Sequence, residues 1–292
     1  MRFFSKMINH PNLTAIKRNS GGIDNVSLDG LFGYDAGDVE NKNKIEVLGS
    51  DNLSYVLKYY FAQLSIKSNQ INNNFKYKLK TVLTPKEIND FIQMTISFED
   101  NKQYDLITKY AIDCLIENSY SEGNDEFNLD FTNTIDFSYL FHIRVNYNLP
   151  IKINSKGNLG DCVCRSENMI LTHDGNLGEN FGFSSNNLLS YIKGNVGPSA
   201  GDSTLDFKST IVGDVGSGMF GDCSKGLVVS IKGDIHSFPN SYPRGAKIYL
   251  DGGILGGHRS FLNSPEYFIG AKARENPEYQ QMMAEWNRRF GE

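Results

Sequence analysis

Two cysteines separated by one residue, Cys162 and Cys164, are the part of this 292-residue chain that most directly suggests chemistry. On a β-strand their side chains would share one face, and paired thiolates are preferred zinc ligands. His173 could supply a third ligand, but Cys223 occupies a different phase of the repeat described below. Because this ligand set is incomplete, we interpret these residues as packing residues and predict neither a metal site nor a cofactor.

Asp214 and Asp234 form a second candidate, because paired carboxylates can bind calcium or act as acid and base on a sugar. The equivalent positions elsewhere in the repeat are Asn158, Asn176 and Asn195. Asn and Asp both suit strained turns, so a structural turn explains all five positions better than an active site does. The sequence also lacks the P-loop and H-E-x-x-H motifs. We therefore assign no catalytic residue, and the sequence identifies no partner for His236 or His258.

The elements that must position these residues follow from a repeat in the second half of the chain. Glycines occur there at intervals of 18, 19, 19, 20 and 19 residues, at positions 157, 175, 194, 213, 233 and 252. An aliphatic residue lies two places after each glycine, at Leu159, Leu177, Val196, Val215, Ile235 and Ile254. Apolar residues also recur at alternate positions before most of these glycines, which is the pattern of a half-buried β-strand.

A repeat of about 19 residues with strand alternation predicts a β-solenoid, in which each period forms one coil and aligned aliphatic side chains form internal ladders. Gly213 and Gly233 are then expected at equivalent corners, roughly one strand spacing of 4.8 Å apart. A left-handed hexapeptide helix needs a small aliphatic residue every six positions, whereas the sixth residue after Leu159 is Arg165. We therefore predict a right-handed parallel β-helix.

The glycine-patterned stretch GDVGSGMFGDCSKGLVVSIKGD resembles the coils of the C-terminal β-helix domain of glutamate synthase. It is similar also to the related β-helix subunit of formylmethanofuran dehydrogenase. The resemblance covers about residues 157–257. It implies a mainly structural domain between catalytic parts, and it transfers no catalytic residue to this chain.

The first half of the chain has a different pattern, which predicts helices. In TPKEINDFIQMTI, Thr84 is a good N-cap, Pro85 suits the first helical position and Glu87 completes a capping box. Two further helices are expected over 53–66 and 104–119, with Cys114 as a small buried hydrophobe. The aromatic and β-branched run over 135–154 predicts strands that lead into the solenoid.

The C-terminal segment predicts a helix that begins at Asn276 and Pro277. Its apolar stripe consists of Tyr279, Met283, Trp286 and Phe290. We expect the helix to pack on the side or end of the solenoid and to bury Trp286, because the open end of a β-stack exposes strand edges. Docking of the stripe onto a partner protein is the alternative, since Trp, Tyr and Met are typical interface anchors.

Composition limits the function classes. A hydrophobic content of 39% with 22% charged residues argues against global disorder. The formal net charge of −5 provides no overall basic footprint for nucleic acid or an anionic membrane. No segment has the pattern of a secretion signal or a membrane span, and four cysteines over this length are typical of reduced thiols. We therefore expect a cytoplasmic protein.

Together these observations predict an α+β protein with a mainly helical region over 1–125, strands and a parallel β-helix over 126–257, and a capping or docking helix over 258–292. The favoured function is non-catalytic: a scaffold or assembly module that binds another protein, or itself, through the β-helix flank or the C-terminal helix. One alternative is a carbohydrate-active β-helix enzyme. The other is a subunit of a larger metabolic complex, which the resemblance favours. We identify no small-molecule, nucleic-acid or membrane partner.

Overall fold

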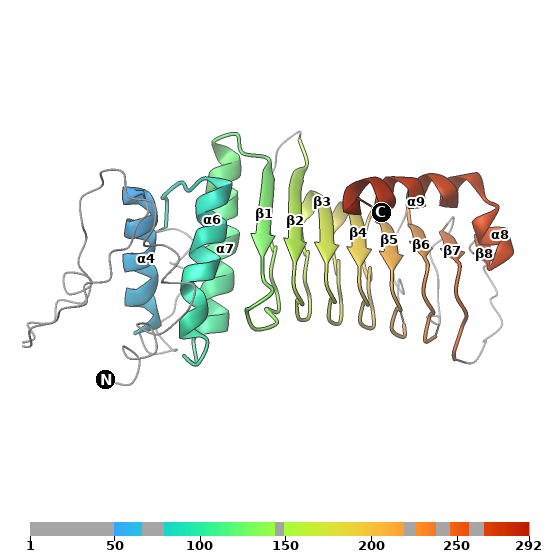
Figure 1. The fold of residues 1–292 in the computed structure, drawn as a ribbon, viewed down its shortest axis with the longest axis horizontal. Coiled ribbons are helices and arrows are strands. Elements are labelled where there is room, and N and C mark those ends of the chain that lie inside the picture. The colour runs from blue at the N-terminus through green and yellow to red at the C-terminus, as the bar shows by residue number, and fades with distance from the viewer. Residues whose placement is uncertain are drawn as a thin grey trace, which may run out of the picture. The chain divides into compact units, whose positions relative to one another are not determined.

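The computed structural model describes residues 50–65, 79–143, 149–218, 226–237, 246–256 and 266–291. The chain divides into two compact units, Met1–Glu122 and Gly123–Glu292. As predicted, the fold is α+β, with helices in the first unit and a parallel β-solenoid followed by a C-terminal helix in the second (Figure 1). Within the described residues, no helix combines the length and apolar character needed to cross a bilayer.

The first unit contains α4 (Asp51–Leu64), α6 (Pro85–Thr95), η3 (Ile96–Phe98) and α7 (Tyr104–Ser121). The predicted capping box is confirmed, because Thr84 and Glu87 each accept a hydrogen bond from the other's backbone N–H. Cys114 is buried, as predicted, and its Sγ lies 3.2 Å from the carbonyl oxygen of Leu79.

The second unit is built on one eight-stranded parallel sheet in which every strand pairs with the next along the chain. Its strands are β1 (Glu126–Asp130), β2 (Ile151–Lys156), β3 (Glu167–Asp174), β4 (Asn186–Lys193), β5 (Lys208–Val212), β6 (Val228–Ile231), β7 (Lys247–Leu250) and β8 (Glu266–Ile269). Paired residues in successive strands, from β2–β3 to β7–β8, are separated along the chain by 18, 19, 19, 20, 19 and 19 positions. The glycine intervals are therefore the register of the sheet.

The repeat glycines lie at stacked corners, which confirms the prediction for Gly213 and Gly233. A Cβ atom built on Gly233 would lie only 2.2 Å from the carbonyl oxygen of Gly213. The backbones of successive coils approach so closely there that a side chain has no room. Past each corner, the aliphatic residues pair in one continuous ladder of parallel bridges, from Leu159 to Ile254.

One strand begins earlier than the predicted strand run, and another lies outside the region predicted for the β-helix. We expected strands over 135–154, but β1 begins at Glu126. Residues 132–143 form turns and irregular backbone that is hydrogen-bonded to residues 160–164 of the next coil. Edge-to-face ring contacts bury Phe131, Phe137 and Phe141 in this part of the chain. The aromatic residues of the run therefore indicate burial in the core and not a β-strand. β8 lies inside the range assigned to the C-terminal helix.

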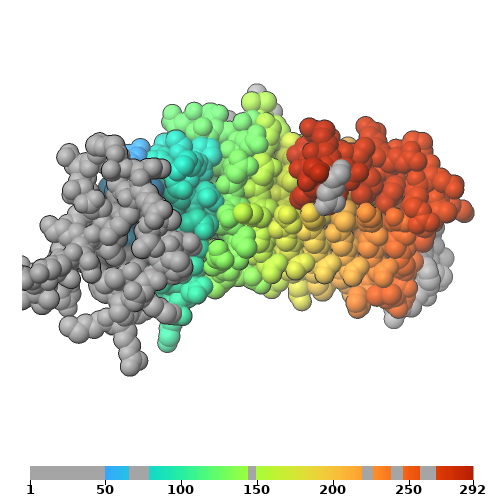
Figure 2. Space-filling view, viewed as in Figure 1, coloured from blue at the N-terminus to red at the C-terminus, as the bar shows by residue number. Residues whose placement is uncertain are grey.

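After β8 the chain turns at Gly270, whose φ of 59° is the left-handed conformation that favours glycine. The short α8 (Ala271–Arg274) follows, and then α9 (Pro277–Phe290). Figures 1 and 2 show α9, in red, running back over the yellow and orange coils along one flank of the solenoid. The idea that this helix covers the end of the coil stack is therefore wrong, and packing on the side is correct.

Candidate binding groove along the C-terminal helix

The outward side chains of the sheet form rows, because alternate residues of a strand point to opposite faces and the register aligns them. The first outer row consists of Leu189, Lys208, Val228 and Lys247, on β4 to β7. The second outer row consists of Thr172, Tyr191, Thr210, Ser230 and Tyr249, on β3 to β7. All five residues of the second row are buried, although they point away from the solenoid core.

The start of α9 is fixed on β7. The Asn276 side chain accepts from the backbone N–H of Glu278, which caps the helix. The Glu278 carboxylate accepts hydrogen bonds from Lys247 Nζ at 2.8 Å and from Tyr249 Oη at 2.5 Å. These two bonds hold the pKa of Glu278 below its ordinary value. Burial, with help from Asp251, raises the pKa of the neighbouring Tyr279 to about 12.

The middle of α9 is anchored by Trp286, which is 1% exposed, as predicted. Its indole Nε1 donates to the carbonyl oxygen of Ile192 on β4, and its ring contacts that of Phe290 at 4.6 Å. Met283 lies against Ser230, where Sδ and Oγ are 3.8 Å apart. A large aromatic residue with a satisfied N–H therefore joins the helix to the centre of the sheet.

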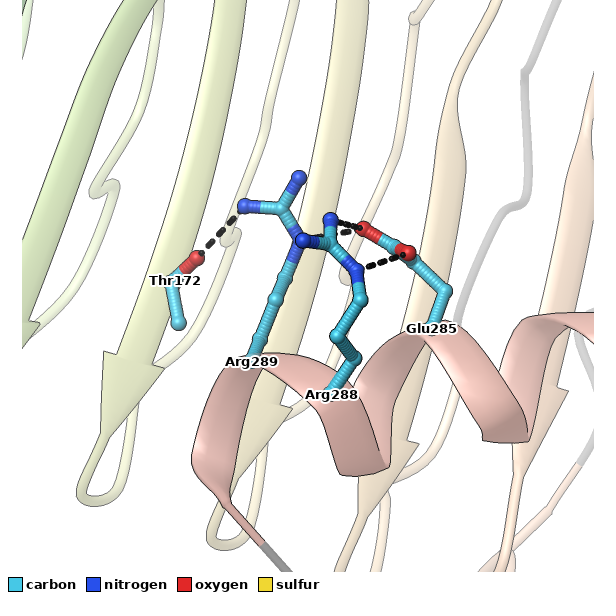
Figure 3. A network of polar contacts seen from close by, with 4 residues as sticks. All are labelled: Thr172, Glu285, Arg288 and Arg289. Atoms are coloured by element: carbon cyan, nitrogen blue, oxygen red, sulfur yellow. Dashed lines mark hydrogen bonds and ion pairs between the residues drawn. The ribbon is translucent and has the colours of Figure 1, made fainter.

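The end of α9 carries a network of two arginines around one carboxylate (Figure 3). Arg288 donates two hydrogen bonds to Glu285, and Arg289 Nε donates a third at 2.9 Å. Together they hold the pKa of Glu285 below its ordinary value, with the Arg288 bond as the largest cause. Arg289 also stacks 4.3 Å above the Tyr191 ring and reaches Thr172 on β3.

A groove of about 540 Å³ lies between α9 and the first outer row. Its sheet side is formed by Leu189, Tyr191, Lys208, Thr210 and Val228, and its helix side by Glu278, Gln281, Met282, Ala284, Glu285 and Arg288. Leu189, Val228 and Met282 are half-buried, whereas Lys208 is exposed. The groove thus combines apolar walls with charged groups at fixed positions, which is typical of binding sites.

The four residues of the predicted partner-binding stripe face the chain's own sheet. Tyr279 and Trp286 are buried, and Met283 and Phe290 are half-buried. The groove lies instead on the adjacent flank of the helix. Its sheet residues were not singled out from the sequence, although a signal was there: Leu189, Lys208, Val228 and Lys247 each lie five residues before a repeat glycine.

The cysteine pair lies in a turn before β3 and not on a strand, which corrects our expectation that the thiols share a strand face. Cys162 and Cys164 both have positive φ, of 56° and 63°. Asn180, Ser199 and Gly218 have the same conformation, and their backbone N–H groups, like that of Cys162, bond to a carbonyl of the following coil. Cys162 therefore occupies a repeated turn position.

His173 is fully buried, with Nδ1 2.9 Å from Ser155 Oγ. Burial lowers its pKa to about 4, so the ring is neutral at physiological pH. Among the described residues, no group of three or more His, Cys, Asp and Glu side chains is placed to hold a metal ion. Cys223 and His258 lie outside the described residues.

Asp214 and Asp234 belong to a ladder of corner side chains. Asn158, Asn176 and Asn195 each accept a hydrogen bond from the backbone N–H of the next corner, and the two aspartates do the same. The ladder ends at Gly253, which donates to Asp234. A carboxylate and an amide oxygen are interchangeable acceptors here, which explains why the sequence uses both.

No protein-family model matches this chain, and no curated protein or solved structure shows significant similarity to it. The resemblance to the glutamate synthase β-helix stays a prediction from glycine spacing. Function must therefore be argued from the groove itself.

Proposed function

We propose that this protein is a non-catalytic assembly module that binds another protein in the groove between α9 and the first outer row. The observation that carries the proposal is a half-open groove of about 540 Å³ on an otherwise regular solenoid. Its walls come from the sheet and from a helix that is tied to the sheet at both ends and in the middle. A preorganised site of this kind loses little entropy when it binds.

The chemistry of the groove favours binding over catalysis. Both of its carboxylates accept hydrogen bonds from two neighbouring residues, so neither is placed to take a proton from a substrate. The pKa values of Glu278 and Glu285 are shifted downward, away from neutrality, which opposes a role as general base. The groove-lining residues also include no cysteine, serine or histidine that could act as a nucleophile or proton shuttle.

The experiment is affinity purification of the tagged full-length protein from its native cells, with a matched pair of variants. Leu189→Arg places a long charged side chain in the groove, whereas Ile170→Arg makes the same change at the equivalent position on β3, outside the groove lining. We expect a protein that co-purifies with the wild type and with Ile170→Arg but not with Leu189→Arg. Recovery of the same partners with all three proteins would contradict the proposal.

A further inference from the structure

One lysine at the centre of the groove makes no direct ion pair with the described residues. Lys208 lies directly between Leu189 and Val228 in the first outer row, because it pairs with both. Its side chain is exposed and makes no direct ion pair with the described residues, although its charge helps to lower the pKa of Glu278. A cation between two aliphatic neighbours therefore lines the floor of the groove.

The other charges of the groove are already neutralised. Glu278 is bound by Lys247 and Tyr249, and Glu285 by Arg288 and Arg289. A cationic ligand would have to compete with these hydrogen-bonded partners for either carboxylate, and breaking such a pair leaves a charge unsatisfied. A ligand carboxylate, in contrast, can pair with Lys208 without displacing a hydrogen-bonded partner. The electrostatic complement of the groove is thus an anion.

The walls limit the type of anion. Leu189, Val228 and Met282 present half-buried aliphatic surface on both sides of Lys208. Val228 and Met282 pack on the cluster of Tyr249, Ala273 and Tyr279, so this surface is continuous with a core. A polyphosphate has no apolar part to place against this surface. A carboxylate next to aliphatic groups matches both the charge of Lys208 and the aliphatic walls of the groove.

We propose, on the basis of the assembly function above, that the groove binds an acidic linear peptide of the partner. In this complex a Glu or Asp side chain of the peptide pairs with Lys208, and adjacent aliphatic side chains of the peptide contact Leu189, Val228 and Met282. The groove is lined by residues of α9 and of β4 to β6, so it accepts an extended segment.

The test measures fluorescence polarisation of a short labelled peptide in which Glu alternates with Leu. Its analogues with Gln or Lys in place of Glu serve as ligand controls. We expect saturable, salt-sensitive binding of the Glu peptide to the full-length wild-type protein and much weaker binding of both analogues. Lys208→Glu should weaken binding roughly five- to tenfold or more, Lys208→Arg should retain it, and Lys232→Glu, an exposed change outside the groove, should leave it unchanged.

Equal binding of the Glu and Gln peptides, or an unchanged affinity in Lys208→Glu, overturns the acidic-peptide assignment. So does competition by a short single-stranded oligonucleotide as effective as that by the peptide itself. If Leu189→Arg releases the native partner while the Glu peptide does not bind, the assembly function stands and only its ligand class is wrong. If Leu189→Arg affects neither the partner nor the peptide, the groove is not the binding site and both proposals fail.

Discussion

The indole Nε1 of Trp286 lies 3.2 Å from the carbonyl oxygen of Ile192, which precedes it by 94 residues in the chain. This hydrogen bond joins the centre of α9 to β4, although the strand that leads into the helix is β8. α9 therefore connects non-adjacent coils of a solenoid, whose coils otherwise contact only their neighbours.

Trp286→Ala should destabilise the second unit by about 3–5 kcal/mol, because it removes a fully buried aromatic side chain. Trp286→Phe should cost less, with about 1 kcal/mol from the lost hydrogen bond to Ile192. Urea titrations of both variants measure these changes. Asn287→Ala, an exposed change on the same helix, is the control and should be neutral.

Trp286 also allows unfolding to be followed by fluorescence, because it is the one tryptophan of the chain. Native fluorescence should be blue-shifted and should move to the red when the second unit unfolds. Native emission typical of solvated indole would show that α9 does not lie on the sheet in solution.

Arg289→Lys should destabilise the second unit by about 1 kcal/mol, because lysine cannot reproduce the planar contact with Tyr191 together with the bonds to Glu285 and Thr172. Arg288→Lys is the matched control. Arg288 belongs to the same Glu285 network but its side chain is largely exposed, so this change should have no measurable effect. Thermal unfolding compares the two variants, and equal losses would mean that the contact with Tyr191 contributes nothing.

Two adjacent glycines should respond differently to alanine. A Cβ atom at Gly252 would lie 2.2 Å from the carbonyl oxygen of Gly233, so Gly252→Ala should cost roughly 1–3 kcal/mol or prevent the last coils from stacking. At Gly253 the nearest atom is Asp234 Oδ1 at 3.4 Å, and Gly253→Ala should be close to neutral. Circular dichroism with urea titration measures both variants. If the two alanines cost the same, the close approach of the corners is not what selects glycine.

Stability should fall between pH 6.5 and pH 4 because of His173. Burial lowers its folded-state pKa to about 4, below the unfolded value of roughly 6.5. The unfolded chain therefore binds more protons in this window, and the free energy of unfolding decreases as the pH falls, by roughly 3 kcal/mol at most.

His173→Gln should reduce the difference in unfolding free energy between pH 7 and pH 5, because it removes this titration. The exposed His236 is the control, and His236→Gln should retain the wild-type difference. A wild-type pH dependence in His173→Gln would assign the effect to other groups.

The sequence alone determined the solenoid and its register, because the close approach of backbones at each corner restricts a single position to glycine. Only glycine fits where the backbones of Gly213 and Gly233 meet, so the spacing of glycines records the length of every coil from β2 to β7. The capping box of α6 and the burial of Trp286 followed for the same reason, since local hydrogen bonds and an apolar stripe can be recognised within a few residues.

Tertiary structure decided which surface α9 covers. The position of β1 within 126–257 and the existence of β8 were missed because neither strand ends at a glycine of the repeat. The turn that holds Cys162 was missed because its residue type differs from coil to coil. An apolar stripe specifies that a helix is buried but not against what, and its partner surface is a row of side chains drawn from separate coils: Thr172, Tyr191, Thr210, Ser230 and Tyr249. The groove exists only because the turn at Gly270 directs the helix back along that row, which leaves Lys208 beside it without an ion-pair partner among the described residues.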